Sequence, residues 1–207
     1  MKVDSFWPPQ RGLRRFAAEY YQRKHPDAPW LSKEGIEMLS DLLRDSDTCL
    51  EYGSGTSTAW FGRRVSKILS AEHDPSWFER VQGQLGAFGL PRDAVRLLSL
   101  EPREHPEQSP YVRLVDEFAD GELTFCYVDG EYRPACIRAA IPKLASGGLL
   151  VLDDAHGVLD HPTFSPHSRA GLGPLDAEWG AIVEQLRAWR MLWASDGYSD
   201  AAIWIKP

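Results

Sequence analysis

Residues 49–58 read "CLEYGSGTST", and this stretch decides the fold. A short apolar run leads into two glycines one residue apart, and a helical pattern follows them. A strand, a glycine turn and a helix in this order are typical of α/β proteins that bring a ligand close to the backbone. The flanking residues must therefore indicate which ligand the turn accepts.

Outward from this turn, short apolar runs alternate with helical patterns, which is typical of an α/β sheet covered by helices on both faces. We expect strands at 48–52, 66–71, 94–100, 122–130, 148–152, 189–195 and 201–206. We expect helices at 58–64, 75–89, 133–144 and 176–189. Residues 1–47 are predicted to form a helical N-terminal cap or a dimerisation segment, and residues 48–207 a single domain.

The composition is that of an ordinary soluble globular protein, with 43% apolar and 26% charged residues in 207. The formal net charge of -7 disfavours a dedicated nucleic-acid binder, which normally presents a basic face. Cys49, Cys126 and Cys136 lack metal-type spacing, and we expect them to be reduced and buried. The N-terminus lacks the apolar core of a signal peptide, and no apolar run approaches membrane-spanning length. We therefore expect a cytoplasmic protein with neither a nucleic-acid nor a membrane partner.

The residues around the glycine turn discriminate between nucleotide ligands. A P-loop requires a lysine after the second glycine, where this chain has Thr56 and Ser57, and a dinucleotide site requires a third glycine where Thr58 stands. Glu51 would repel a diphosphate and suits a cationic amine. Glu72, about 20 residues later, closes the second strand and could accept hydrogen bonds from two ribose hydroxyls. A cationic amino acid joined to adenosine, as in S-adenosylmethionine, would satisfy both carboxylates.

Two segments resemble motifs of the class I S-adenosylmethionine-dependent methyltransferases: "LEYGSGTST…ILSAEHDPSW" and "YVDGEYRPACIRAAIPKLASGGLLVLDDAH". The second segment resembles their small-molecule O-methyltransferase branch, in particular the macrocin and the catechol or caffeoyl-CoA groups. The resemblance covers roughly residues 48–154. It implies a Rossmann-like fold whose seven-stranded, mostly parallel sheet ends in an antiparallel strand. The candidate cofactor-binding residues are Glu51, Gly53, Ser54, Gly55, Ser57, Thr58, Glu72, His73 and Asp129.

Three carboxylates lie at the ends of two predicted strands: Asp129 at the end of the fourth, and Asp153 and Asp154 directly after the fifth. Carboxylates placed together repel one another unless protons or a cation intervene, and Mg²⁺ prefers oxygen ligands. The resemblance makes these three residues candidate ligands of Mg²⁺ or another divalent cation. In the alternative without a metal, Asp129 positions the methionine end of the cofactor, and the aspartate pair caps the following turn.

Methyl transfer to a hydroxyl also needs a general base. The candidates are Glu131, which matches an acid of the macrocin-like pattern, and His156. The long segment between Asp154 and Asp176 is rich in glycine, proline and histidine, and we expect it to act as a substrate lid.

Three other residues near these motifs have less specific interpretations. Trp60 and Trp77 are expected to lie in the core rather than at a ligand. Arg133 could bind an anionic group of the substrate, but a residue at the start of a helix is more often solvated, and this is what we expect.

The sequence therefore predicts an S-adenosylmethionine-dependent methyltransferase that acts on a hydroxyl of a small molecule with the help of Mg²⁺, in a chain that could form a homodimer. Two alternatives stay open. One is a methyltransferase that acts on a macromolecule, and the other is a binding domain of the same fold without catalysis.

Overall fold

The computed structural model describes residues 9–25 and 27–207, so residues 1–8 and 26 of the predicted N-terminal segment lie outside it. One seven-stranded sheet has the order β3-β2-β1-β4-β5-β7-β6. Strands β1 to β5 are parallel, and β7 is antiparallel to both of its neighbours. The strands are β1 (Thr48–Tyr52), β2 (Lys67–Glu72), β3 (Val95–Leu97), β4 (Leu123–Val128), β5 (Leu144–Leu152), β6 (Arg190–Ser195) and β7 (Asp200–Ile205). The predicted seven-stranded, mostly parallel α/β fold is confirmed.

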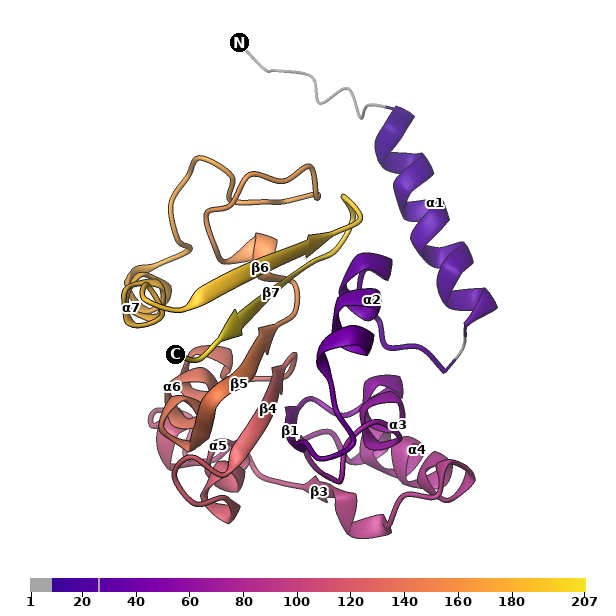
Figure 1. Ribbon diagram of the computed structural model, residues 1–207, viewed down its shortest axis with the longest axis vertical. Coiled ribbons are helices and arrows are strands. Elements are labelled where there is room, and N and C mark those ends of the chain that lie inside the picture. The colour runs from indigo at the N-terminus through magenta and orange to yellow at the C-terminus, as the bar shows by residue number, and fades with distance from the viewer. Residues whose placement is uncertain (1–8, 26) are drawn as a thin grey trace.

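Helices lie on both sides of this sheet (Figure 1). They are α1 (Pro9–Lys24), α2 (Lys33–Leu42), α3 (Thr56–Gly62), α4 (Pro75–Leu85), α5 (Pro110–Arg113), α6 (Arg133–Lys143) and α7 (Ala177–Gln185). The start of α4 follows from its sequence. Asp74 accepts hydrogen bonds from the backbone N–H groups of Ser76 and Trp77, and Pro75 occupies the first turn, where a missing N–H costs little. No described helix has the length and apolar character needed to cross a membrane.

The sheet divides the apolar side chains into two cores, because successive residues of a strand point to opposite faces. On one face, the strands pack with Ile36 and Leu39 of α2 and with Phe61 of α3. On the other face, they pack with residues of α5, α6 and α7. The three cysteines are buried and free, as predicted. Although α2 contributes to a core, the proposed domain division at residue 48 stays a prediction.

The predicted boundaries differ from the structure mainly at β3, before β4, and at β5, which begins at Leu144 rather than at residue 148. β3 pairs only with β2 at the sheet edge and is limited to Val95–Leu97 rather than 94–100. No element was predicted between β3 and β4, yet α5 forms there. The hydroxyl of Ser109 accepts a hydrogen bond from the backbone N–H of Val112 and caps this short helix.

The centre of the sheet provides a place for a ligand. From β1 the chain winds outward through β2 and β3, and then returns to β4 on the other side of β1. Ligands of such sheets bind beyond the carboxyl ends of the strands at this switch point. Here Gly53 follows β1 and Asp129 follows β4, so the two predicted motifs meet.

Candidate functional site

A side chain would have different effects at the two glycines of the turn. Gly53 has φ +96°, and a Cβ there would lie 2.8 Å from the backbone nitrogen of Gly130, so this glycine lets the loops after β1 and β4 touch. Gly55 has extended backbone, and a Cβ there would meet only the Oγ of Ser57, at 3.6 Å. Gly53 is therefore needed by the fold, whereas Gly55 leaves open space beside the turn.

Glu51 is fully buried beneath the turn and accepts three hydroxyl hydrogen bonds. Its donors are Ser57 at 2.6 Å, Thr58 at 2.5 Å and Ser70 at 2.6 Å. Burial raises the pKa of Glu51 to about 7, the three hydrogen bonds oppose this rise, and the charge of Asp129 adds to it. The carboxylate thus ties β1, β2 and α3 together. Its predicted contact with a cationic ligand stays a prediction.

Glu72 ends β2 beside the same turn and is 4% exposed. One carboxylate oxygen accepts from the hydroxyl of Ser54 at 2.8 Å. The other accepts from the backbone N–H groups of His73 and Asp74, at 2.8 and 2.9 Å. These bonds fix the acid in the position from which the sequence predicts that it binds a ribose.

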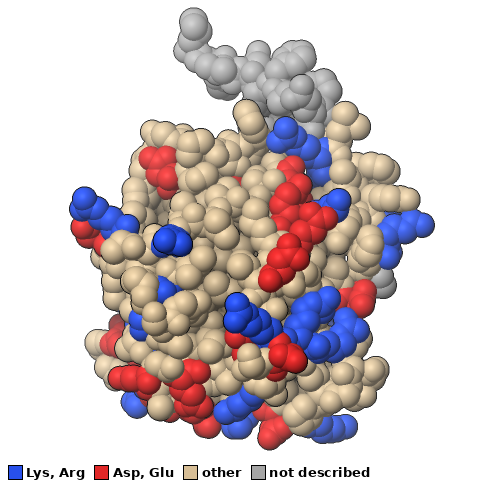
Figure 2. Space-filling view, viewed as in Figure 1, with Lys and Arg blue, Asp and Glu red and all other residues tan. Residues whose placement is uncertain are grey.

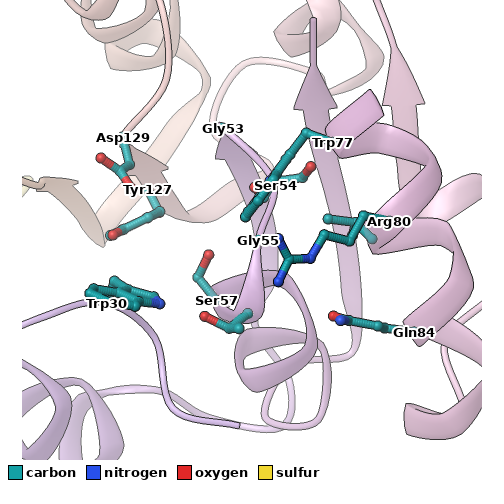
Figure 3. Close-up of a pocket in the computed structure, with 12 residues that line it drawn as sticks. Trp30, Gly53, Ser54, Gly55, Ser57, Trp77, Arg80, Gln84, Tyr127 and Asp129 are labelled. Atoms are coloured by element: carbon teal, nitrogen blue, oxygen red, sulfur yellow. Dashed lines mark hydrogen bonds between the residues drawn. The ribbon is translucent and has the colours of Figure 1, made fainter. Parts of the chain in front are cut away.

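A cavity of about 420 Å³ opens over the turn (Figure 3). This volume lies within the range of small-molecule sites. It is lined by Trp30, Gly53, Ser54, Gly55, Thr56, Ser57, Trp77, Arg80, Val81, Gln84, Tyr127 and Asp129. The structure thus brings together five of the predicted cofactor residues: Gly53, Ser54, Gly55, Ser57 and Asp129. Glu51, Thr58, Glu72 and His73 are not among its lining residues.

Several lining residues were not predicted from the sequence. Trp60 is buried in the core as expected, but the core assignment of Trp77 is wrong, because Trp77 is 39% exposed and lines the cavity. Its indole N–H donates to the backbone oxygen of Ser54 at 2.6 Å. Trp77, Arg80 and Gln84 recur at helical spacing on α4, which begins at the ligand edge of the sheet, and this spacing was a usable signal.

The three aspartates of the predicted metal site do come together. Asp129, Asp153 and Asp154 each offer one carboxylate oxygen, and these oxygens all lie within 4.8 Å of one another. Burial raises the pKa of Asp129 to about 6, and Asp154 adds to the rise while Arg133 opposes it. Burial, together with the charges of Asp129 and Asp154, raises the pKa of Asp153 well above its ordinary value. One buried oxygen of Asp153, Oδ1, has no hydrogen-bond partner. This donor set fits a hard divalent cation.

Arg133 is part of this cluster, and the expectation that it is solvated is wrong. Its guanidinium donates to the carboxylate and the backbone oxygen of Asp129 at 2.9 and 2.8 Å. It also donates to the backbone oxygens of Asp153 at 2.7 Å and Gly130 at 3.1 Å. One positive charge therefore faces three carboxyl groups, which leaves the ionised cluster negative.

The proposed capping role of Asp154 is wrong. This residue begins the turn Ala155–Gly157 with φ +50°, but its side chain makes no capping hydrogen bond. The Oδ1 atom of Asp154 instead accepts from the hydroxyl of Ser199 at 3.4 Å. A left-handed non-glycine residue at the site fits the tendency of functional residues to adopt sparsely populated conformations.

Three buried polar side-chain atoms in the described part of the chain have no hydrogen-bond partner: Tyr111 Oη, Asp153 Oδ1 and His156 Nδ1. The Oη of Tyr111 lies against Gly130, in the loop after β4, while Asp153 and His156 follow β5. Buried polar groups are normally paired, and these three lie at the same edge of the sheet, where a bound ligand could reach them. Glu131, the other predicted base, is exposed at this edge.

Hydrogen bonds hold the long segment between Asp154 and Asp176 against the rest of the protein. The hydroxyl of Ser165 donates to the buried carboxylate of Asp200 at 2.5 Å. The backbone N–H of Arg169 donates to the carbonyl of His156 at 2.9 Å. These bonds anchor the segment to β7 and to the turn beside the aspartates. Its function as a substrate lid stays a prediction.

Known structures share the fold of this chain. A methyltransferase from Geobacter sulfurreducens matches with a TM-score of 0.57 and 14% identity, over 94% of this chain and 90% of that one. The chain has the Rossmann-like fold of the class I methyltransferases. A Streptococcus mutans protein described as a methyltransferase was solved with S-adenosylhomocysteine. It matches with a TM-score of 0.55 and 12% identity, over 84% of this chain and 99% of that one. A Klebsiella pneumoniae protein described as an O-methyltransferase matches with a TM-score of 0.54 and 15% identity, over 83% of this chain and 77% of that one.

Sequence comparisons do not show to which family this chain belongs. No protein-family model matches the chain. A Salinispora tropica protein is 28% identical over 165 residues, 68% of each chain, and is named an imidazole-4-carboxamide isomerase whose substrate carries two phosphoribosyl groups.

Proposed function

We propose that the protein is an S-adenosylmethionine-dependent methyltransferase that methylates a hydroxyl of a small molecule. The observation that carries this proposal is the cavity at the switch point, where the open space at Gly55 lies beside the fixed pair of Ser54 and Glu72. Ligands of such sheets bind in this place. The complex of the S. mutans protein with S-adenosylhomocysteine supports the choice of cofactor, and the K. pneumoniae protein supports hydroxyl methylation.

When bound, the cofactor supplies an electrophilic methyl group on a sulfonium centre. The residues of this chain bind and orient it. Glu72 already accepts from Ser54 and two backbone N–H groups, which use three of its roughly four acceptor positions, so the carboxylate oxygen bonded to Ser54 has one position left for a ribose hydroxyl. Asp129 gives the same cavity a negative side that favours the cationic end of the cofactor.

The acceptor hydroxyl must be aligned and deprotonated. We propose that Asp129, Asp153 and Asp154 hold a divalent cation such as Mg²⁺, which would lower the pKa of a bound hydroxyl and fix its direction. Glu131 and His156 are the candidates that remove the proton. His156 carries a buried ring nitrogen without a partner, whereas the side chain of Glu131 is exposed.

Isothermal titration calorimetry with S-adenosylhomocysteine tests the cofactor assignment. Glu72→Gln removes the charge that would bind the ribose, and we expect affinity to fall at least about tenfold, because hydrogen bonds to charged groups contribute about 1.5–3 kcal/mol. Glu79→Gln, on the exposed surface of α4, is the matched control and should bind as the wild type does. Equal affinities of the wild type and Glu72→Gln would remove this assignment.

Transfer of a labelled methyl group to a panel of phenols, catechols and sugar alcohols tests the reaction. We expect the label on an oxygen atom of the product, located by mass spectrometry. A label found only on nitrogen, or tight cofactor binding with no transfer to any member of the panel, would contradict hydroxyl methylation.

A further inference from the structure

The cavity over the glycine turn carries opposite charges on opposite walls. Asp129 lies on one side, at the end of β4. Arg80 extends from α4 on the other side, and its guanidinium points into the cavity toward Gly55 and Ser57 (Figure 3). The two charged groups therefore face the same open cavity from different directions, and Asp129 also accepts from the guanidinium of Arg133 at 2.9 Å.

Arg80 has no acidic partner among the residues that the structure describes. Among the residues that the structure describes, it takes part in none of the ion pairs. Its guanidinium lies 4.8 Å from the ring centroid of Trp77, a cation–π contact that holds the side chain along the cavity wall. Gln84, one turn further along α4, adds an amide to the same wall.

The chemistry of these walls describes a ligand. A guanidinium matches a carboxylate in a bidentate geometry, and a carboxylate attracts an ammonium group. A short fragment that carries both groups is the zwitterion of an α-amino acid. Trp30 and Trp77 add apolar surface that suits the carbon chain between the zwitterion and the rest of the ligand.

We propose that this cavity binds the α-amino-acid end of its ligand, and that Arg80 binds the carboxylate while the ammonium group faces Asp129. The proposal rests on the proposed function, under which this fragment is the amino-acid end of the cofactor. Arg80 is then a binding residue that distinguishes the complete cofactor from a nucleoside without the amino acid.

The test compares two ligands that differ only in this fragment. S-adenosylhomocysteine carries the amino acid, and 5′-methylthioadenosine lacks it. Binding of both is measured by calorimetry for the wild type, for Arg80→Gln, and for Arg92→Gln as a matched exposed arginine outside the cavity. Thermal melts of the variants verify that each is folded.

We expect Arg80→Gln to weaken S-adenosylhomocysteine about 5- to 20-fold, because one charge-assisted contact at a partly exposed site is lost. The affinity for 5′-methylthioadenosine should change by less than about twofold, since this ligand makes no contact with Arg80. Arg80→Lys should restore part of the lost affinity, and Arg92→Gln should equal the wild type.

Each contrary result has a separate meaning. If Arg80→Gln weakens both ligands equally, or neither, the assignment of Arg80 is overturned while the cofactor proposal stands. The assignment is also overturned if Arg80→Gln only raises the KM of an acidic acceptor, because Arg80 then binds the acceptor. If the wild type binds neither ligand, the proposed function itself is overturned.

Discussion

Substituting the two glycines of the turn one at a time should separate folding from binding. In Gly53→Ala, the new Cβ would lie 2.8 Å from the nitrogen and 2.9 Å from the Cα of Gly130, which are backbone atoms that cannot rotate away. The backbone angle of φ +96° is also unfavourable for alanine. In Gly55→Ala, the nearest atom is the Oγ of Ser57 at 3.6 Å, which is an ordinary contact.

These distances set the expected magnitudes. A non-glycine residue in such a conformation costs about 1–3 kcal/mol, before the displacement of the Gly130 backbone is added. In a domain of this size, 1 kcal/mol shifts the Tm by about 2–4 °C, so we expect Gly53→Ala to lower the Tm by about 4–10 °C. Gly55 precedes α3 as its N-cap, where alanine is less favourable than glycine by about 1 kcal/mol or less, so its Tm should fall by at most about 3 °C.

Binding should show the opposite order. The methyl group of Gly55→Ala occupies space beside the cavity, so its affinity for S-adenosylhomocysteine should fall at least about tenfold in calorimetry, whereas folded Gly53→Ala should lose less. Thermal melts and titrations of both variants measure the two effects. Equal Tm losses in the two variants, or unchanged affinity in Gly55→Ala, would refute the separate functions of the two glycines.

Three further predictions concern buried acids. Because the folded-state pKa of Glu51 is about 7 against an ordinary value of 4.5, the folded state retains a proton that the unfolded state loses in this window, and Glu51 alone should lower stability by about 3 kcal/mol as pH rises from 4.5 to 7. The raised pKa values of Asp129 and Asp153 act in the same direction, so urea denaturation of Glu51→Gln should show a shallower slope than the wild type, and equal slopes would contradict the prediction. Mg²⁺ should raise the Tm of the wild type by a few degrees, and it should do the same for Asp93→Asn, an exposed control. The Tm of Asp153→Asn should not rise. Equal Tm shifts in all three proteins would exclude the aspartate cluster as the Mg²⁺ site. Asp200→Asn should loosen the segment after β5, so that trypsin cleaves after Arg169 several-fold faster than in the wild type, and unchanged cleavage would show that this anchor is unimportant.

The sequence was sufficient to predict the seven strands along the chain and the acid at the end of β2. Apolar runs bounded by glycine, proline and acidic residues gave seven strands, because a buried parallel strand needs side chains that are apolar on both faces. Glu72 was identified because its distance from the glycine turn corresponds to one helix and one strand. These signals are local and need no knowledge of tertiary contacts.

The contacts of Arg133 and Trp30 could not be predicted in the same way. Arg133 is held by backbone oxygens of Gly130 and Asp153, which come together only when β4 and β5 pair. Trp30 reaches the cavity from the segment before α2 and follows no periodic pattern. Helical spacing would have found Trp77 and Arg80, but a tryptophan in an amphipathic helix is usually explained by the core.

The hydrogen bonds of Glu51 have an evolutionary consequence. Ser57 and Thr58 belong to α3 and Ser70 to β2, so one acid holds hydroxyls from two segments that also position the glycine turn and Glu72. Loss of the acid would leave the hydroxyls without their acceptor, and loss of the hydroxyls would leave a buried charge without donors. We therefore expect homologous sequences either to keep all four positions or to replace them together with apolar residues.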